Sequence, residues 1–253
     1  MIFITSEIGI NHNGNLEITK KLIDIAKLCG CDAIKLQKRT VEKVYTKEFL
    51  DSLRDSPWGK TQRDQKMGLE FSKVQYDEIA QYCLGKIDWY ASAWDMESQK
   101  FLRQYNLKYN KIASPMALDM DLVFFVAEEQ KQTFISTGKV NFDQLDAIVD
   151  LFKGYKCPFT LMHCVLKYPC PDEICRLKGI GELKQRYNCP VGYSNHNPSI
   201  LVPSLAVAFG AEALEIHITE DRTMYGSDQA ASFEMMGLYY VVRDAQRVRS
   251  IIE

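Results

Sequence analysis

The chain has 253 residues, of which 31 are basic, 33 are acidic and 46% are hydrophobic, and its formal net charge is −2. This composition excludes a disordered chain, and the charge is not that of a basic nucleic-acid-binding domain. No apolar run reaches the roughly 18 residues that span a bilayer, and the N-terminal stretch lacks the basic region of a signal peptide. We therefore expect a cytoplasmic globular protein, whose length suits one (β/α)8 barrel.

Eight cysteines are spread over the chain, five of them between positions 157 and 189. Their spacing is irregular and includes no CxxC pair, so a metal or cluster site is the weaker of two interpretations. We expect reduced thiols that pack as small buried side chains.

Short apolar runs alternate with longer amphipathic runs along the chain. The apolar runs predict strands at 2–9, 32–37, 88–94, 109–114, 133–138, 159–164, 190–194 and 213–218. The amphipathic runs predict helices at 16–30, 73–84, 96–105, 119–130, 141–152, 175–187, 199–209 and 234–252. Strict alternation of this kind indicates parallel strands joined by right-handed crossovers.

An open doubly wound sheet is the competing architecture. It would favour a glycine-rich phosphate turn after the first strand, but residues 11–14 read Asn-His-Asn-Gly, which is not such a turn. The sequence therefore predicts a single-domain TIM (β/α)8 barrel over 1–253. The stretch 38–72, after the second strand, is predicted to be a long irregular loop over the mouth of the barrel, and loops of that length are usually functional.

Polar residues gather where the predicted strands end, which is where the active sites of such barrels lie. The candidates are Glu7, Lys35, Gln37, Lys111, Ser114, Ser136, Gly138, His163, Cys164, Ser194, His196, Glu215 and His217. Three of the four histidines of the chain are among them. The sequence thus predicts one polar site at the C-terminal end of the barrel.

His196 and His217 lie at the ends of neighbouring strands. Two imidazoles placed in this way can bind a divalent metal ion and leave positions open for water and substrate. The alternative is that each histidine is a hydrogen-bonded residue of the barrel wall.

Lys35 and Lys111 lie inside predicted strands, where an unpaired charge is costly. They favour a bound anion, and hydroxyl groups at neighbouring strand ends would complete its cage: Ser114, Ser136 and Ser194. Two other readings stay open. The lysines could pair with Glu7 and Glu215 inside the barrel, or one of them could form a Schiff base with a carbonyl substrate.

Taken in order, these motifs resemble the sialic acid synthase family, the phosphoenolpyruvate-dependent synthases of N-acetylneuraminic, legionaminic and pseudaminic acids. The motifs are Glu7–Gly14, Lys35–Gln37, Lys111–Ser114, Ser136–Gly138, His163–Cys164 with Tyr168–Pro169, Gly192–His196 and Glu215–His217. The resemblance covers essentially the whole chain.

The resemblance implies a transferase of carbohydrate biosynthesis that condenses phosphoenolpyruvate with an open-chain, N-acetylhexosamine-like aldose to give a nonulosonic acid and phosphate. It implies Mn²⁺, or Mg²⁺ or Co²⁺ in its place, bound by His196 and His217. It assigns catalytic roles to Glu7, Lys111, Glu215 and His217. It assigns substrate binding to Lys35, Gln37, Ser114, Ser136, Gly138, Tyr168, Ser194 and Asp228.

Several features depart from the family pattern. The family's C-terminal antifreeze-like domain does not follow the last predicted helix, which leaves the homodimer and the N-acetyl requirement open and suggests a separately encoded domain. Residues 194–196 read Ser-Asn-His in place of Ser-Asp-His, and 165–166 read Val-Leu where polar residues are usual. The alternatives are a Schiff-base lysine aldolase on the same fold and a non-catalytic sugar-binding subunit.

Overall fold

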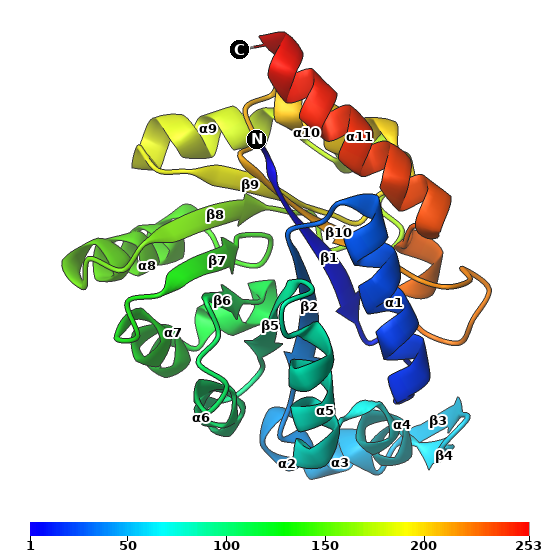
Figure 1. Cartoon of the computed structure of the whole chain (residues 1–253). Coiled ribbons are helices and arrows are strands. Elements are labelled where there is room, and N and C mark those ends of the chain that lie inside the picture. The colour runs from blue at the N-terminus through cyan, green and yellow to red at the C-terminus, as the bar shows by residue number, and fades with distance from the viewer. Residues whose placement is uncertain (253) are drawn as a thin grey trace.

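Eight parallel strands close into a barrel in the computed structural model, which describes residues 1–252 (Figure 1). The strands follow one another around the barrel in the order β1-β10-β9-β8-β7-β6-β5-β2. Their bounds are β1 Phe3–Gly9, β2 Ala33–Lys38, β5 Asp88–Ala93, β6 Tyr109–Ile112, β7 Gln132–Ser136, β8 Phe159–His163, β9 Val191–Asn195 and β10 Ala213–His217. The predicted TIM barrel is confirmed.

A helix follows each barrel strand and packs on the outside. These are α1 Leu16–Cys29, α5 Lys73–Cys83, α6 Met96–Arg103, α7 Met120–Ala127, α8 Phe142–Gly154, α9 Lys178–Tyr187, α10 Leu201–Ala208 and α11 Met235–Ile252. Local signals set their ends. In α1 the Asn15 side chain accepts hydrogen bonds from two backbone N–H groups, and Gly30 ends the helix at φ 88°, a conformation that favours glycine.

Within residues 1–252, no helix combines the length and the apolar character needed to cross a bilayer.

Aromatic rings fill the N-terminal end of the barrel. Phe134 stacks on Phe3 at 5.4 Å and on Tyr90 at 5.9 Å between ring centroids, and Tyr109 lies against the same group. The Tyr90 hydroxyl is hydrogen-bonded to Thr5 Oγ1 at 2.8 Å, so the one polar atom of this buried ring has a partner. This apolar plug closes one end of the barrel and leaves the other end for polar side chains.

The stretch predicted as an irregular loop is instead built from short elements. It forms α2 Val41–Val44, α3 Lys47–Leu50, a hairpin of β3 Leu53–Ser56 and β4 Gly59–Thr61, and α4 Gln62–Leu69, which gather beyond the end of β2 (Figure 1). Arg63 of α4 forms ion pairs with Asp51, at 2.9 Å, and with Glu42 of α2, and so links these short elements. The sequence pattern missed these elements because each is too short to show a period.

All eight cysteines are free thiols. Seven are buried and Cys189 is half-buried, which agrees with their interpretation as small packed side chains.

Candidate functional site

A cavity of about 290 Å³ opens at the C-terminal end of the barrel. Every predicted catalytic, substrate and metal residue except Gly138 lines it: Glu7, Lys35, Gln37, Lys111, Ser114, Ser136, Tyr168, Ser194, His196, Glu215, His217 and Asp228. Strand register explains the assembly. Glu7 of β1 is paired in the sheet with His217 of β10 on one side and with Lys35 of β2 on the other, so the three stand at one level of the barrel.

Gly138 lies behind the cavity wall. A Cβ atom at this position would meet Cys164 Sγ at 2.9 Å and the Cys164 carbonyl oxygen at 3.0 Å. Cys164 itself lines the cavity and is 5% exposed. The absence of a side chain at 138 therefore lets the Cys164 segment pack closely, and the substrate contact expected of Gly138 stays a prediction.

Two carboxylates and two ammonium groups form a buried chain of ion pairs across the floor of the cavity. Lys35 Nζ lies 2.9 Å from Glu7 Oε2 and 3.6 Å from Glu215 Oε1. Lys111 Nζ lies 3.1 Å from Glu215 Oε2. All four side chains are at most 5% exposed. The structure therefore contains the pairing of Lys35 and Lys111 with glutamates, which was one of the alternatives left open by the sequence.

Burial and pairing set the charges of this chain. Burial opposes ionisation of Glu215, but Lys111 and Lys35 outweigh it and lower the pKa of Glu215 to about 2. Burial likewise opposes charge on Lys35, but Glu215 and Glu7 raise its pKa. Lys111 and Glu7 shift the other way: burial lowers the pKa of Lys111 and raises the pKa of Glu7. Lys111 and Glu7 are thus the members whose charges are most easily changed.

Hydroxyl groups extend the same network. Lys111 Nζ donates to Ser136 Oγ at 2.6 Å, and the Ser194 hydroxyl donates to Glu215 Oε1 at 3.1 Å. Gln37 Nε2 donates to the second oxygen of Glu7 at 2.9 Å. Ser136 and Ser194, two of the three serines predicted to orient an anion, thus contact the charged side chains directly.

The His196 ring is held in one tautomer. Its Nδ1 donates to the Val165 carbonyl oxygen at 2.6 Å, which leaves Nε2 as an acceptor for the Tyr168 hydroxyl at 2.7 Å. Burial lowers the pKa of His196 to about 3, so the ring is neutral at physiological pH. A neutral imidazole with its Nδ1 bound to a backbone carbonyl is the usual state of a metal-binding histidine.

His217 stands beside it, with 5.3 Å between the two ring centroids. Its Nδ1 is buried, has no hydrogen-bond partner among the described residues, and lies 3.8 Å from Asp228 Oδ2. Across residues 1–252, no group of three or more His, Cys, Asp or Glu side chains is arranged as a metal site. The two adjacent imidazoles fit a divalent ion whose other ligands are water and substrate.

Sequence reasoning missed four charged or aromatic residues that line the same cavity: Arg39, Tyr45, Lys66 and Trp94. Arg39 had a signal, because Lys35, Gln37 and Arg39 alternate along β2 and its end with the period of one strand face. Lys66 had none, because α4 reaches the mouth only through the packing of the 38–72 stretch.

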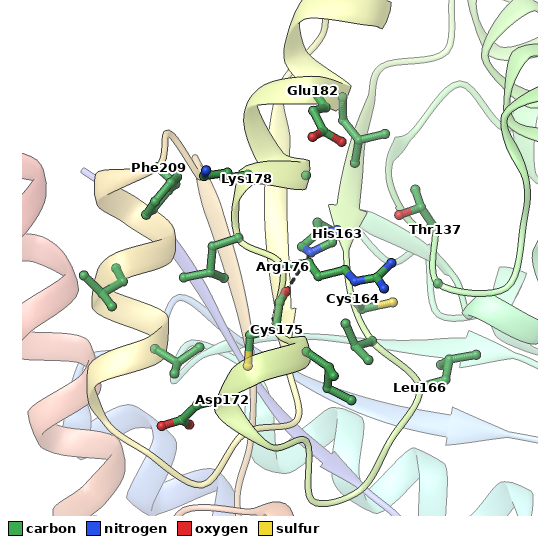
Figure 2. Close-up of a pocket in the computed structure, with 18 of the residues that line it drawn as sticks. Thr137, His163, Cys164, Leu166, Asp172, Cys175, Arg176, Lys178, Glu182 and Phe209 are labelled. Atoms are coloured by element: carbon green, nitrogen blue, oxygen red, sulfur yellow. Dashed lines mark hydrogen bonds between the residues drawn. The ribbon is translucent and has the colours of Figure 1, made fainter.

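His163 points away from the mouth, although it ends a barrel strand. Its Nε2 is 3.0 Å from the Cys175 carbonyl oxygen, and it lines a second, largely apolar cavity of about 1130 Å³ between α8, α9 and α10 (Figure 2). Cys164 and Leu166 border both cavities. Burial lowers the pKa of His163. The strand-end pattern therefore placed His163 in the right layer but on the wrong side of the wall.

The similarity of this chain to known proteins extends over nearly its whole length. Residues 22–253 match the model of the NeuB family. The N-acetylneuraminate-9-phosphate synthases of Drosophila melanogaster and Homo sapiens are 37% and 35% identical in sequence to this chain. These matches cover 92% and 97% of this chain, which spans 64% and 70% of the two relatives' lengths.

A solved structure agrees with this match. The N-acetylneuraminic acid synthetase of Leptospira borgpetersenii, crystallised with citrate, has a TM-score of 0.90 and 31% identity. That match covers 99% of this chain and 85% of the other. The barrel, the polar mouth and these relatives agree, and the chain belongs to the NeuB family.

Proposed function

We propose that this protein is a synthase that condenses phosphoenolpyruvate with the open-chain form of an N-acetylhexosamine-like sugar, giving a sialic-acid-like nonulosonic acid and phosphate. The observation that carries the proposal is the joint placement of the Glu7–Lys35–Glu215–Lys111 chain and the His196–His217 pair in one cavity of a NeuB-family barrel. A binding-only protein has no need of both features.

Phosphoenolpyruvate would bind above the ion-pair chain. Its carboxylate and phosphate are anions, and Lys35 and Lys111 supply the nearest buried cations. Ser136 already accepts a hydrogen bond from Lys111 and would turn its hydroxyl towards a phosphate oxygen. Because the glutamates already pair the lysines, they orient the ammonium groups before the substrate arrives, which lowers the cost of reorganisation during the reaction.

The reaction joins C3 of phosphoenolpyruvate to the aldehyde carbon of the sugar. The aldehyde oxygen takes up a proton, water adds to C2, and the C–O bond to phosphate breaks, so that a 2-keto acid and phosphate are formed. Glu7 has a raised pKa and lies at the same level as His217, so it is the carboxyl group suited to exchange a proton with a reacting oxygen.

His196 and His217 would hold a divalent ion, with Mn²⁺ as the first candidate and Mg²⁺ or Co²⁺ as alternatives. When bound there, the ion would polarise the aldehyde oxygen as a Lewis acid. Tyr168 and Asp228 stand next to the two imidazoles and would then face the sugar or ordered water. The hydroxyl of Tyr168 would have to leave His196 Nε2 for that nitrogen to bind the metal.

Relatives of this chain support an N-acetylated acceptor. They include N-acetylneuraminate-9-phosphate synthases, the N,N'-diacetyllegionaminic acid synthase of Legionella pneumophila, 33% identical, and the pseudaminic acid synthase of Campylobacter jejuni, 32% identical. Their names differ in whether the product carries a phosphate, so overall identity does not choose between a phosphorylated and an unphosphorylated acceptor.

The test is a phosphate-release assay with phosphoenolpyruvate, Mn²⁺ and a panel of aldoses, N-acetylhexosamines and their terminal phosphates. We expect release only when all three components are present, together with a keto acid product of matching mass. Absence of release with every sugar, from a folded protein that holds Mn²⁺, would refute the proposal.

The lowered pKa of Lys111 favours one competing reaction, a Schiff-base aldolase. Borohydride reduction in the presence of pyruvate separates the two reactions, since only an imine is trapped as a stable adduct. We expect no increase in protein mass. A covalent pyruvate adduct at Lys111 would replace the synthase by the aldolase.

A further inference from the structure

A group of cations stands at the β2 side of the cavity, apart from the lysines of the ion-pair chain. Arg39 directly follows β2 and is 8% exposed, and its guanidinium stacks on the Trp94 ring at 4.2 Å. Lys66 on α4 lies 5.3 Å from the centre of the Tyr45 ring. Both aromatic rings line the cavity with their cations, so the two charges are held in fixed positions.

These cations are only partly neutralised. Glu70 pairs with both Lys38, at 3.1 Å, and Arg39, at 3.5 Å. In the described part of the chain Lys66 has no ion pair, and the nearest charges that act on it are Arg39 and Arg54, which repel it, and Asp228, which attracts it. The neighbouring cations are therefore four and the carboxylates two, which leaves two positive charges uncompensated in this group. The cations are Lys38, Arg39, Arg54 and Lys66, and the carboxylates are Glu70 and Asp228.

Unfilled hydrogen-bonding capacity lies in the same place. Arg39 Nε and Trp94 Nε1 are buried donors without an acceptor within residues 1–252. Burial, together with repulsion from Arg39 and Arg54, lowers the pKa of Lys66 to about 8. Buried donors and surplus positive charge are costly unless a ligand uses them, and a phosphate dianion would supply both oxygens and charge.

This group is separate from the site proposed for phosphoenolpyruvate. Lys35 and Lys111 are each within 3.1 Å of a glutamate oxygen. Lys66 instead lines the cavity from α4 of the 38–72 stretch, and Arg54 of the same stretch is near enough to repel it. Arg54 donates to the Tyr225 hydroxyl at 3.3 Å, which ties this stretch to the loop after β10. The mouth therefore has two cationic regions, at the floor and at the rim.

We infer that the acceptor sugar carries a phosphate on the carbon furthest from its aldehyde, and that Arg39, Lys66 and Arg54 bind this phosphate. The inference rests on the proposed function and makes it specific to a class of acceptor. The aldehyde would face the imidazoles and the phosphate would reach the rim, so the substrate would span the mouth. Arg39 supplies the planar fork that suits phosphate oxygens, and Lys66 supplies a point charge.

The test compares an N-acetylhexosamine 6-phosphate with the same unphosphorylated sugar. We expect the protein to favour the phosphate at least a hundredfold in kcat/KM. Lys66→Gln and Arg54→Gln should each reduce this preference at least tenfold, and Lys66→Arg should retain most of it. Lys60→Gln is the matched control, because Lys60 belongs to the same stretch, is 78% exposed and pairs with Asp55 outside the cavity. It should leave the preference unchanged.

The KM values identify which phosphate is bound. A rise in the KM for the sugar phosphate in Lys66→Gln supports the inference. A rise confined to the KM for phosphoenolpyruvate would show that the rim binds the phosphate of the other substrate, and would overturn it. An unchanged preference in both glutamine variants, with unaltered thermal stability, would also overturn it.

Calorimetric titration of the sugar phosphate into the protein separates this inference from the proposed function. Binding that is lost in Lys66→Gln but kept in Lys60→Gln supports the phosphate site even if no phosphoenolpyruvate is consumed. Equal binding of the sugar phosphate and the unphosphorylated sugar would overturn the site even if synthase activity is found.

Discussion

The ammonium group of Lys111 lies 3.1 Å from Glu215 Oε2, and both side chains are almost completely buried. Removal of Glu215 would leave the ammonium group of Lys111 uncompensated in a medium that solvates it poorly. Because Glu215 also lies 3.6 Å from Lys35, this single carboxylate contacts both cations of the proposed phosphoenolpyruvate site, while Glu7 supplies the second negative charge.

Glu215→Gln should therefore unfold at lower urea concentration, with a loss of about 3 kcal/mol in the free energy of unfolding. Activity should fall at least a hundredfold, because the two lysines lose the group that orients them. Lys111→Met combined with Glu215→Leu should recover much of the stability and none of the activity, since the pair is removed together. A Glu215→Gln protein as stable as the parent would contradict the buried pairing.

His196→Ala and His217→Ala should each abolish metal-dependent phosphate release. Mn²⁺ binding, measured by calorimetry after chelator treatment, should weaken at least tenfold in both, because each variant removes one of two imidazole ligands. The matched control is His163→Gln, since His163 lies in the outer cavity and makes its contact with the Cys175 carbonyl. Full activity of either alanine variant without added metal would refute the metal assignment.

Gly138→Ala should disturb the cavity wall at Cys164. The new methyl group would lie 2.9 Å from Cys164 Sγ, so either the thiol or the strand end must move, at a cost of about 1–3 kcal/mol. Gly154→Ala, at the end of α8, is the control: nothing lies within 4 Å of the added carbon, and we expect unchanged or slightly raised stability. Equal melting temperatures for the two variants would argue against the close packing at Cys164.

The preference for a phosphorylated acceptor should decline as the pH rises through 8. The pKa of Lys66 is lowered to about 8, so its charge is mostly present at pH 7 and mostly lost at pH 9. A sugar phosphate stays a dianion over this interval, because its second pKa is near 6. The ratio of kcat/KM values for the phosphorylated and unphosphorylated sugars should fall about tenfold between pH 7 and 9.

Lys66→Arg provides the check, because an arginine side chain keeps its charge throughout this range. Its ratio should be flat between pH 7 and 9. The use of a ratio of kcat/KM values cancels titrations that affect both sugars equally. A decline of the same size in Lys66→Arg would assign the pH dependence to another group.

The barrel and the layer that holds the site could be read from the sequence. The hydrophobic period and the polar residues that end most of the strands are local signals, and eight repeats of the same unit leave few topologies. Closure of parallel strands then brings their ends together, which is why Glu7, Lys111, His196 and His217 were expected at one site before any contact was known.

Only the tertiary structure decided which partners these side chains have. Lys35 and Lys111 could each have met an anion or a glutamate, and the register of β1, β2 and β10 brings Glu7 and Glu215 to them. The direction of His163 was likewise decided by the fold. A side chain at a strand end can point to either side of the barrel wall, and that of His163 lines the outer cavity.

The rim of the mouth depends on tertiary packing most of all. Lys66 reaches the cavity because α4 folds back over the barrel, and no periodic pattern in its short helix predicts that position. Local sequence determines which elements form, because backbone hydrogen bonds and caps act over a few residues. Contacts between distant segments depend on how the closed barrel packs, so the charges that Arg39 and Lys66 place at one edge of the mouth could be known only from the fold.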